Sequence, residues 1–220
     1  MAVITISKEH GAGGREIAVQ LARTLGYQLV DKAMIIKVAQ QAKVTSERVE
    51  KYDQEEYSPM AKYLSNMFLA NPSLYTGMGF EMPMAGPLPG GYDFFDAEQY
   101  LKLTQGVIEG LYQKGDVIIV GRGSQVLLAG KQGCLHLRMV APLEERIKRA
   151  MAQGLPEKEA KDRIHKRDKA RAAYIRDFYG RDAADPSLYH LVINTHWWGT
   201  DKVVSLVKEA LKLVSGVMSP

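Results

Sequence analysis

The sequence predicts an α/β protein built on a mostly parallel sheet with helices on both faces. Two observations support this: short β-branched runs alternate with amphipathic segments along most of the chain, and a glycine-rich turn joins the first such pair. Strands that alternate with helices are typical of parallel, doubly covered sheets. The 220 residues, 46% of them hydrophobic, suit one domain with insertions better than two independent domains.

The first βα unit is the clearest. Residues 2–6 form a β-branched run, and Ile17, Leu21 and Leu25 then recur at helical spacing before Gly26, a good helix terminator. Residues 27–30 predict a second strand that ends at Asp31. Helices are expected at 33–42 and from about 45 to 57.

The regular pattern then stops. Between residues 58 and 96 the chain carries five prolines, and five glycines lie between residues 77 and 91. A loop this long inside a compact domain is usually functional or disordered. Both a flexible insertion and a segment that covers a substrate remain open.

Alternation resumes in the second half. We expect a helix at 97–114, a strand at 117–120 that leads into the turn Gly121-Arg122-Gly123, and another strand at 135–140. Pro142 is placed for the first turn of a helix that ends near residue 154. A charged helical segment at 156–179, a fifth strand at 191–194 and an amphipathic helix at 200–214 complete the pattern.

Composition narrows the function classes. A formal charge of +4 and a pI near 9.0 suit an anionic small molecule as well as nucleic acid. The single cysteine, Cys134, excludes an intramolecular disulfide, and the start of the sequence lacks the features of a secretion signal. No apolar run approaches the ~20 residues that a membrane-spanning helix needs. We therefore expect a cytoplasmic protein with no membrane partner.

Ligands in open α/β sheets bind beyond the carboxyl ends of the strands. After the first strand, Gly11, Gly13 and Gly14 let backbone N–H groups turn inward at a helix N-terminus, which favours an anion. Asp31 follows the second strand, and Arg122 follows the third with a guanidinium that can hold phosphate bidentately. The candidate phosphate-binding residues are Lys8, His10, Gly11, Ala12, Gly13, Gly14, Arg15 and Glu16.

The glycine turn differs from both common nucleotide motifs. Aligned on Gly13, the phosphate-loop pattern G-x-x-x-x-G-K-[ST] meets Gly14 at the lysine position and Arg15 at the hydroxyl position. We hypothesise that Lys8 or Arg15 supplies the missing cation. The dinucleotide pattern G-x-G-x-x-G/A meets Glu16 at its third small position, although Asp31 is placed for a ribose contact. Taken alone, three glycines after a strand favour a tight βα turn without a binding role.

The charged helix shifts this balance. Arg163, Arg167 and Arg171 lie at i, i+4 and i+8, with Arg176 further on, and such arginines can close over phosphates. The alternative is a solvated helix whose aspartates pair with them. Nucleic-acid binding needs a basic face, and this helix is the one segment that resembles such a face. No His, Cys or Asp cluster has metal-ligand spacing.

Together these residues resemble the cytidylate kinase-like family of nucleoside monophosphate kinases. The similar segments are VITISKEHGAGGREIAVQLARTLGYQLVDKAMI, VIIVGRGSQVLL, LRMVAPLEERIKRAM, RDKARAAYIRDFYG and DPSLYHLVINT, which together span about 200 residues. The insertion is covered poorly. Where established cytidylate kinases carry the loop lysine and hydroxyl, this chain has Gly14 and Arg15.

The resemblance implies a three-layer αβα fold of the P-loop kinase type, with a five-stranded parallel sheet. The core would comprise residues 1–42, 97–154 and 186–220, with a monophosphate-binding insertion at 43–96 and an arginine-rich helical lid at 155–185. It implies ATP as phosphoryl donor, substrate-borne Mg²⁺, and CMP, dCMP or another small phosphorylated acceptor.

The resemblance also assigns roles to residues. Asp31, Lys32, Arg122 and Gly123 would face the acceptor, and Arg163, Arg167, Arg171 and Arg176 would come from the lid. Catalysis would depend on Asp31, Arg167 and Arg171, together with Lys8 and Arg15, which we hypothesise as replacements for the loop lysine. A nucleotide-binding protein without catalysis is the first alternative, and a Rossmann-type NAD-binding dehydrogenase is the second. Neither a nucleic-acid partner nor an oligomeric state is implied.

Overall fold

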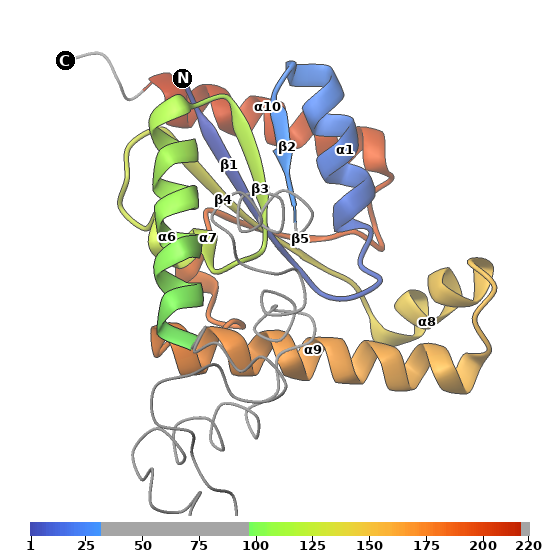
Figure 1. Cartoon of the computed structure of the whole chain (residues 1–220). Helices are drawn as coiled ribbons and strands as arrows, with labels where there is room; N and C mark the ends of the chain where they lie inside the picture. The colour runs from blue at the N-terminus through green and yellow to red at the C-terminus, as the bar shows by residue number, and fades with distance from the viewer. Residues whose placement is uncertain (32–96, 217–220) are drawn as a thin grey trace, which may run out of the picture.

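The computed structural model describes residues 1–31 and 97–216. Its five-stranded parallel sheet has the order β2-β3-β1-β4-β5 (Figure 1). This confirms the predicted fold class and strand number. The strands are β1 (Val3–Lys8), β2 (Gln28–Val30), β3 (Val117–Val120), β4 (Cys134–Val140) and β5 (Leu191–Asn194).

The predicted helices in the described residues are present, with ends shifted by up to two residues, whereas the helix at Ser124–Leu127 and the 3₁₀ turn at Pro186–Leu188 were not predicted. The described helices are α1 (Gly14–Leu25), α6 (Ala97–Lys114), α7 (Ser124–Leu127), α8 (Leu143–Ala152), α9 (Glu157–Tyr179) and α10 (Thr200–Gly216), with a short 3₁₀ turn η1 at Pro186–Leu188. Pro142 is the N-cap of α8, one residue before the predicted first turn. The predicted helices at 33–42 and 45–57 and the insertion at 43–96 lie outside the described residues.

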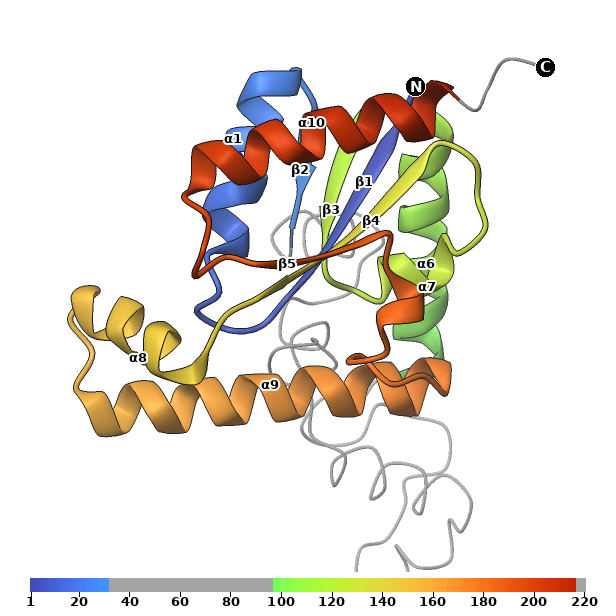
Figure 2. The ribbon, with the colours of Figure 1, turned by 180° about the vertical axis from the view of Figure 1, so that it is seen from behind.

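Helices cover both faces of the sheet. Figures 1 and 2 show α1 and α10 on one face and α6 with α7 on the other. Alternation along β1 explains the two layers: Ile4 and Ile6 join the core with α1 and α10, whereas Val3 packs in a cluster with Ile108 of α6. Burial of both faces accounts for the β-branched strand sequences.

Helix α9 runs across the carboxyl ends of the strands (Figures 1 and 2). Its 23 residues make it about 35 Å long at the α-helical rise. The helix therefore lies at the edge of the sheet where the glycine turn and the Gly121-Arg122-Gly123 turn emerge. None of the helices in residues 1–31 and 97–216 is long and apolar enough to cross a membrane.

Candidate phosphate-binding site

The glycine turn connects β1 to the N-terminus of α1. Gly11 and Gly13 have φ of 81° and 73°, a region that glycine enters without strain. The Ala12 N–H donates to the Glu9 carbonyl (3.1 Å), and the Ile17 N–H donates to the Gly13 carbonyl (3.2 Å). No side chain caps the first turn of α1. The amide groups of this turn and the helix dipole favour an anion at the N-terminus of α1, where phosphate binding stays a prediction.

Close packing explains the glycines at positions 11 and 14. A Cβ at Gly11 would lie 3.1 Å from the Arg146 Cβ on α8, and one at Gly14 would lie 2.8 Å from the Lys8 Cβ. The Lys8 side chain therefore occupies the space that a side chain at position 14 would need. This packing accounts for the glycine at position 14.

The turn after β3 is strained. Gly121, Arg122 and Gly123 have φ of 75°, 64° and 67°, and a left-handed arginine is uncommon. Arg122 is 5% exposed, and the Tyr179 hydroxyl donates to its carbonyl (3.1 Å). A Cβ at position 123 would lie 2.3 Å from the Tyr179 ring, so Gly123 is required there. Such strain persists at sites where the surrounding structure holds it.

A small cavity of about 40 Å³ lies where the two turns meet α9. The glycine turn contributes Lys8 and His10, the β3 turn contributes Arg122, and α9 contributes Arg167 and Arg171. Five of the residues predicted from separate parts of the sequence thus line one cavity. Val120, Gly121 and Asp168 complete its lining.

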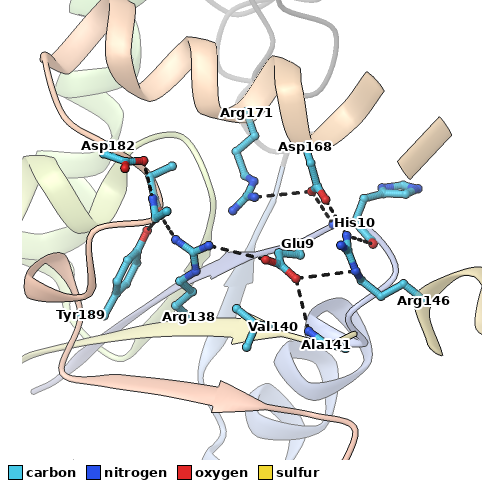
Figure 3. Close-up of polar contacts among 12 residues, drawn as sticks. Glu9, His10, Arg138, Val140, Ala141, Arg146, Asp168, Arg171, Asp182 and Tyr189 are labelled. Atoms are coloured by element: carbon cyan, nitrogen blue, oxygen red, sulfur yellow. Dashed lines mark hydrogen bonds and ion pairs between the residues drawn. The ribbon is translucent and has the colours of Figure 1, made fainter. Parts of the chain in front are cut away.

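Two carboxylates and three arginines form a partly buried network beside this cavity (Figure 3). Glu9 lies 3.6 Å from both the Arg138 Nη2 and the Arg146 Nε, and it accepts from the Ala141 N–H (3.3 Å). Arg138 also donates to the Ala183 carbonyl. Asp168 contacts the Arg146 Nη1 (2.5 Å) and the Arg171 Nη2 (3.4 Å). The network joins β4, α8, α9 and the glycine turn, and it carries one excess positive charge.

Of these three arginines, Arg171 has the most buried nitrogens without a hydrogen-bond partner among the described residues. It is 9% exposed, and its Nε and Nη1 are buried without a hydrogen-bond partner among the described residues. Burial lowers the pKa of its guanidinium, while the neighbouring Asp168 acts in the opposite direction. Leaving a buried guanidinium with two unsatisfied nitrogens is costly. A bound anion in the cavity would satisfy both.

The other predicted residues lie outside the cavity lining. Arg15 is largely exposed, and its Nη2 lies 3.5 Å from Asp31. Arg163 pairs with Glu159 (2.7 Å) and Arg176 with Asp177 (3.0 Å) on exposed faces of α9. The alternative of a solvated charged helix is therefore correct for these two arginines and wrong for Arg171. Glu16 is exposed, Ala12 is fully buried, and Lys32 lies outside the described residues.

Sequence reasoning missed the residues that support the site. Glu9, Arg138, Arg146 and Thr195 were not singled out, and Asp168 was considered as a partner in a solvated helix. Asp168 is adjacent to Arg167 and three residues before Arg171, a spacing that places Asp168 and Arg171 on one helix face. That spacing was the available signal. Arg138 lies within a strand and gave no signal.

Comparison with solved structures supports the same fold. The crystal structure of a protein from Eubacterium ventriosum matches with a TM-score of 0.67 at 17% identity, covering 96% of this chain and 99% of that one. A gluconokinase from Sinorhizobium meliloti matches with a TM-score of 0.51 at 9% identity, covering 98% of this chain and 95% of that one. At these identities the similarity shows the fold alone.

The described residues form a three-layer αβα protein on a five-stranded parallel sheet, the fold that the gluconokinase structure shares. The model of the Cytidylate kinase-like family matches residues 3–196, and the chain belongs to that family. Cytidylate kinases of Methanopyrus kandleri and Thermococcus kodakarensis are 35% identical over 108 residues and 38% identical over 104 residues. These matches cover 45% and 46% of this chain and 56% and 51% of the relatives, so the chain spans about half the length of the curated relatives it matches.

The strand order separates this fold from the dinucleotide-binding alternative. In a Rossmann sheet the second strand lies directly beside the first. Here β3 lies between β2 and β1. Asp31, at the end of β2, is therefore one strand further from the glycine turn than the dinucleotide pattern needs. The family match and this topology overturn the alternative of an NAD-binding dehydrogenase.

Proposed function

We propose that this protein is an ATP-dependent nucleoside monophosphate kinase that transfers the γ-phosphoryl group of ATP to CMP, dCMP or another small phosphorylated acceptor. The observation that carries the proposal is Arg171, buried with two unpartnered nitrogens at a cavity that is also lined by Lys8, Arg122 and Arg167. Four cations around one cavity suit a phosphate group better than a neutral substrate. The cytidylate kinase names of the relatives support the choice of acceptor.

Phosphoryl transfer requires positioned reactants and compensation of the charge that develops on the transferred group. In our proposal the amides of the glycine turn and Lys8 hold the donor phosphates. Arg122, from the strained β3 turn, faces the acceptor phosphate. Arg167 and Arg171, from α9, contact the group in transfer. Helix α9 crosses the strand ends, so it can also exclude water from the cavity and limit ATP hydrolysis.

Mg²⁺ is expected to arrive with ATP as part of the substrate. Within residues 1–31 and 97–216, no group of three or more His, Cys, Asp or Glu side chains could hold a metal ion. Arg15 stands where the phosphate-loop pattern has its metal-binding hydroxyl. Mg²⁺ bound with the nucleotide would neutralise phosphate charge, whereas the residues of this chain would orient the phosphates.

The test measures ADP release from Mg·ATP with a panel of acceptors that includes CMP, dCMP, UMP, AMP and GMP. We expect turnover with a cytidine monophosphate and much slower ADP release without acceptor. Turnover with none of the panel, while calorimetry still detects ATP binding, would overturn the kinase proposal. That result would favour a nucleotide-binding protein without catalysis. This second candidate is supported by Gly14, which stands at the lysine position of the phosphate-loop pattern.

A further inference from the structure

Asp168 connects three parts of the site. Its Oδ1 accepts from the His10 N–H of the glycine turn (2.9 Å) and lies 3.4 Å from the Arg171 Nη2 on its own helix. Its Oδ2 accepts from the Arg146 Nη1 of α8 (2.5 Å). Figure 3 shows the side chains of Asp168 and Arg171 extending from α9 toward the glycine turn. One carboxylate thereby joins the turn, α8 and α9.

The position of this carboxylate is electrostatically unexpected. It is the acidic member of a cavity lining that otherwise contributes Lys8, Arg122, Arg167 and Arg171. A negative charge beside a phosphate site repels the phosphate, and a partly buried position screens that repulsion less than bulk water does. The cost of this repulsion must therefore be offset by another contribution of Asp168 to the site.

That contribution is the orientation of Arg171. The guanidinium of Arg171 is planar, so a contact between its Nη2 and Asp168 sets the direction of its remaining N–H groups. Those groups include the buried Nε and Nη1 that lack partners. Asp168 also holds Arg146, whose Nη1 donates to the His10 carbonyl (3.3 Å) and whose Nε lies 3.6 Å from Glu9. The same carboxylate thus fixes the helix that carries Arg171 against the turn.

We propose that Asp168 is a positioning residue, which orients Arg171 toward a bound phosphate and fixes α9 in register with the glycine turn. This inference rests on the proposed function, because it assumes that the phosphate belongs to a nucleotide. It assigns Asp168 no contact with the reacting atoms. Its effect on catalysis passes through Arg171, because its contacts with the His10 amide and Arg146 hold the helix that presents Arg171.

A double-mutant cycle tests the inference. Asp168→Asn keeps the side-chain shape and removes the charge, and Arg171→Met removes the guanidinium. We expect Asp168→Asn to lower kcat/KM at least 10-fold, with the larger part in kcat because a misdirected Arg171 affects the transition state most. In the Arg171→Met background the same substitution should change kcat/KM less than 3-fold. Asp162→Asn, on an exposed part of the same helix, is the matched control and should leave kcat/KM unchanged.

Two results would overturn the proposal: additive effects of the two substitutions, or tighter ATP binding by Asp168→Asn, which would mean that the carboxylate only repels phosphate. Circular dichroism and urea unfolding check that each variant folds. If Asp168→Asn does not fold, Asp168→Glu replaces it, since it keeps the charge and moves it by one methylene. The same non-additivity is then expected.

The cycle is also measured as binding of ATP and of CMP by calorimetry. A wild-type protein that binds nucleotide without turnover would refute the kinase proposal, while non-additive binding effects would still support the role of Asp168. Turnover with additive effects would refute the role of Asp168 and leave the kinase proposal intact. A wild-type protein that binds neither nucleotide would overturn both.

Discussion

The guanidinium of Arg149 on α8 donates to both the hydroxyl (3.0 Å) and the carbonyl (3.1 Å) of Thr195, the residue that follows β5. The Thr195 hydroxyl in turn donates to the Ala12 carbonyl of the glycine turn (2.8 Å). Thr195 is 4% exposed. This chain of hydrogen bonds joins the glycine turn to α8 and to the residue after β5, so the shape of the turn depends on the end of the last strand in the sequence.

Thr195→Val should therefore destabilise the protein and weaken ATP binding. Valine fills the same volume but leaves the Ala12 carbonyl and one Arg149 donor without their partner, which costs ~1–3 kcal/mol for a buried group. Urea unfolding measures the stability and calorimetry the ATP affinity. Thr195→Ser keeps the hydroxyl and should retain most of both. Equal losses in the Val and Ser variants would contradict a role for the hydroxyl.

Gly14→Ala should lower the free energy of unfolding by about 1–3 kcal/mol, because the new Cβ would lie 2.8 Å from the Lys8 Cβ. Gly110→Ala on α6 is the matched control, since a Cβ there meets nothing within 4 Å, and it should not destabilise. Gly14→Lys should likewise be destabilising alone and better tolerated together with Lys8→Gly. If the double variant is no more stable than Gly14→Lys, the two positions do not share their space.

Lys8→Ala should weaken ATP binding by roughly 10-fold or more, the effect of losing one charge-assisted hydrogen bond. Arg15→Ala should have a smaller effect, because its side chain is exposed and faces Asp31. Lys169→Ala on the exposed side of α9 controls for net charge. Calorimetry with ATP measures all three. A larger loss in Arg15→Ala would assign the displaced cation to Arg15.

Arg171→Met should reduce kcat/KM by roughly 10- to 100-fold, because a buried guanidinium that binds a charged group contributes about 1.5–3 kcal/mol. Arg171→Lys should restore little, since lysine lacks the planar fork. Arg163→Met, on an exposed turn of the same helix, should have wild-type kinetics. Steady-state kinetics with Mg·ATP and CMP give the comparison. Similar losses in the two Met variants would mean that α9 acts through its overall charge.

The free energy of unfolding should fall as the pH drops from about 6.5 to 4, because of His136. This histidine is buried. In the neutral tautomer whose Nε2–H donates to the Leu128 carbonyl, its Nδ1 accepts from the Thr5 hydroxyl. Burial, with a smaller contribution from His190, lowers the pKa of His136 from 6.5 to about 4. In that range the unfolded chain binds a proton that the folded chain does not, so the stability present above pH 6.5 is lost as pH falls, by up to about 3 kcal/mol.

Urea unfolding at pH 7.5, 6 and 4.5 measures this loss. His136→Gln removes the titrating ring and should flatten the pH dependence, whereas His165→Gln, on an exposed part of α9, should preserve it. If the free energy of unfolding depends on pH equally in the wild type and in His136→Gln, a group other than His136 causes the pH dependence.

The sequence alone determined the fold class and most of the element boundaries. The spacing of hydrophobic residues and the positions of glycines are local properties of the sequence. They predicted three elements to the residue: the strands at 117–120 and 191–194 and the helix at 97–114. The glycine turn and Arg122 were likewise predictable, because a residue that follows a parallel strand must lie at the carboxyl edge of the sheet.

Only the tertiary structure decided which charges form the site. Arg163, Arg171 and Arg176 belong to one helix, yet Arg171 alone among these three is buried beside the cavity. That outcome depends on how α9 crosses the strand ends, which local spacing does not specify. From the sequence, either Lys8 or Arg15 could replace the lysine of the phosphate-loop pattern. Lys8 lines the cavity whereas Arg15 is exposed, and this is why we propose Lys8. Which side chain reaches a cavity depends on contacts between neighbouring segments and not on their order in the chain.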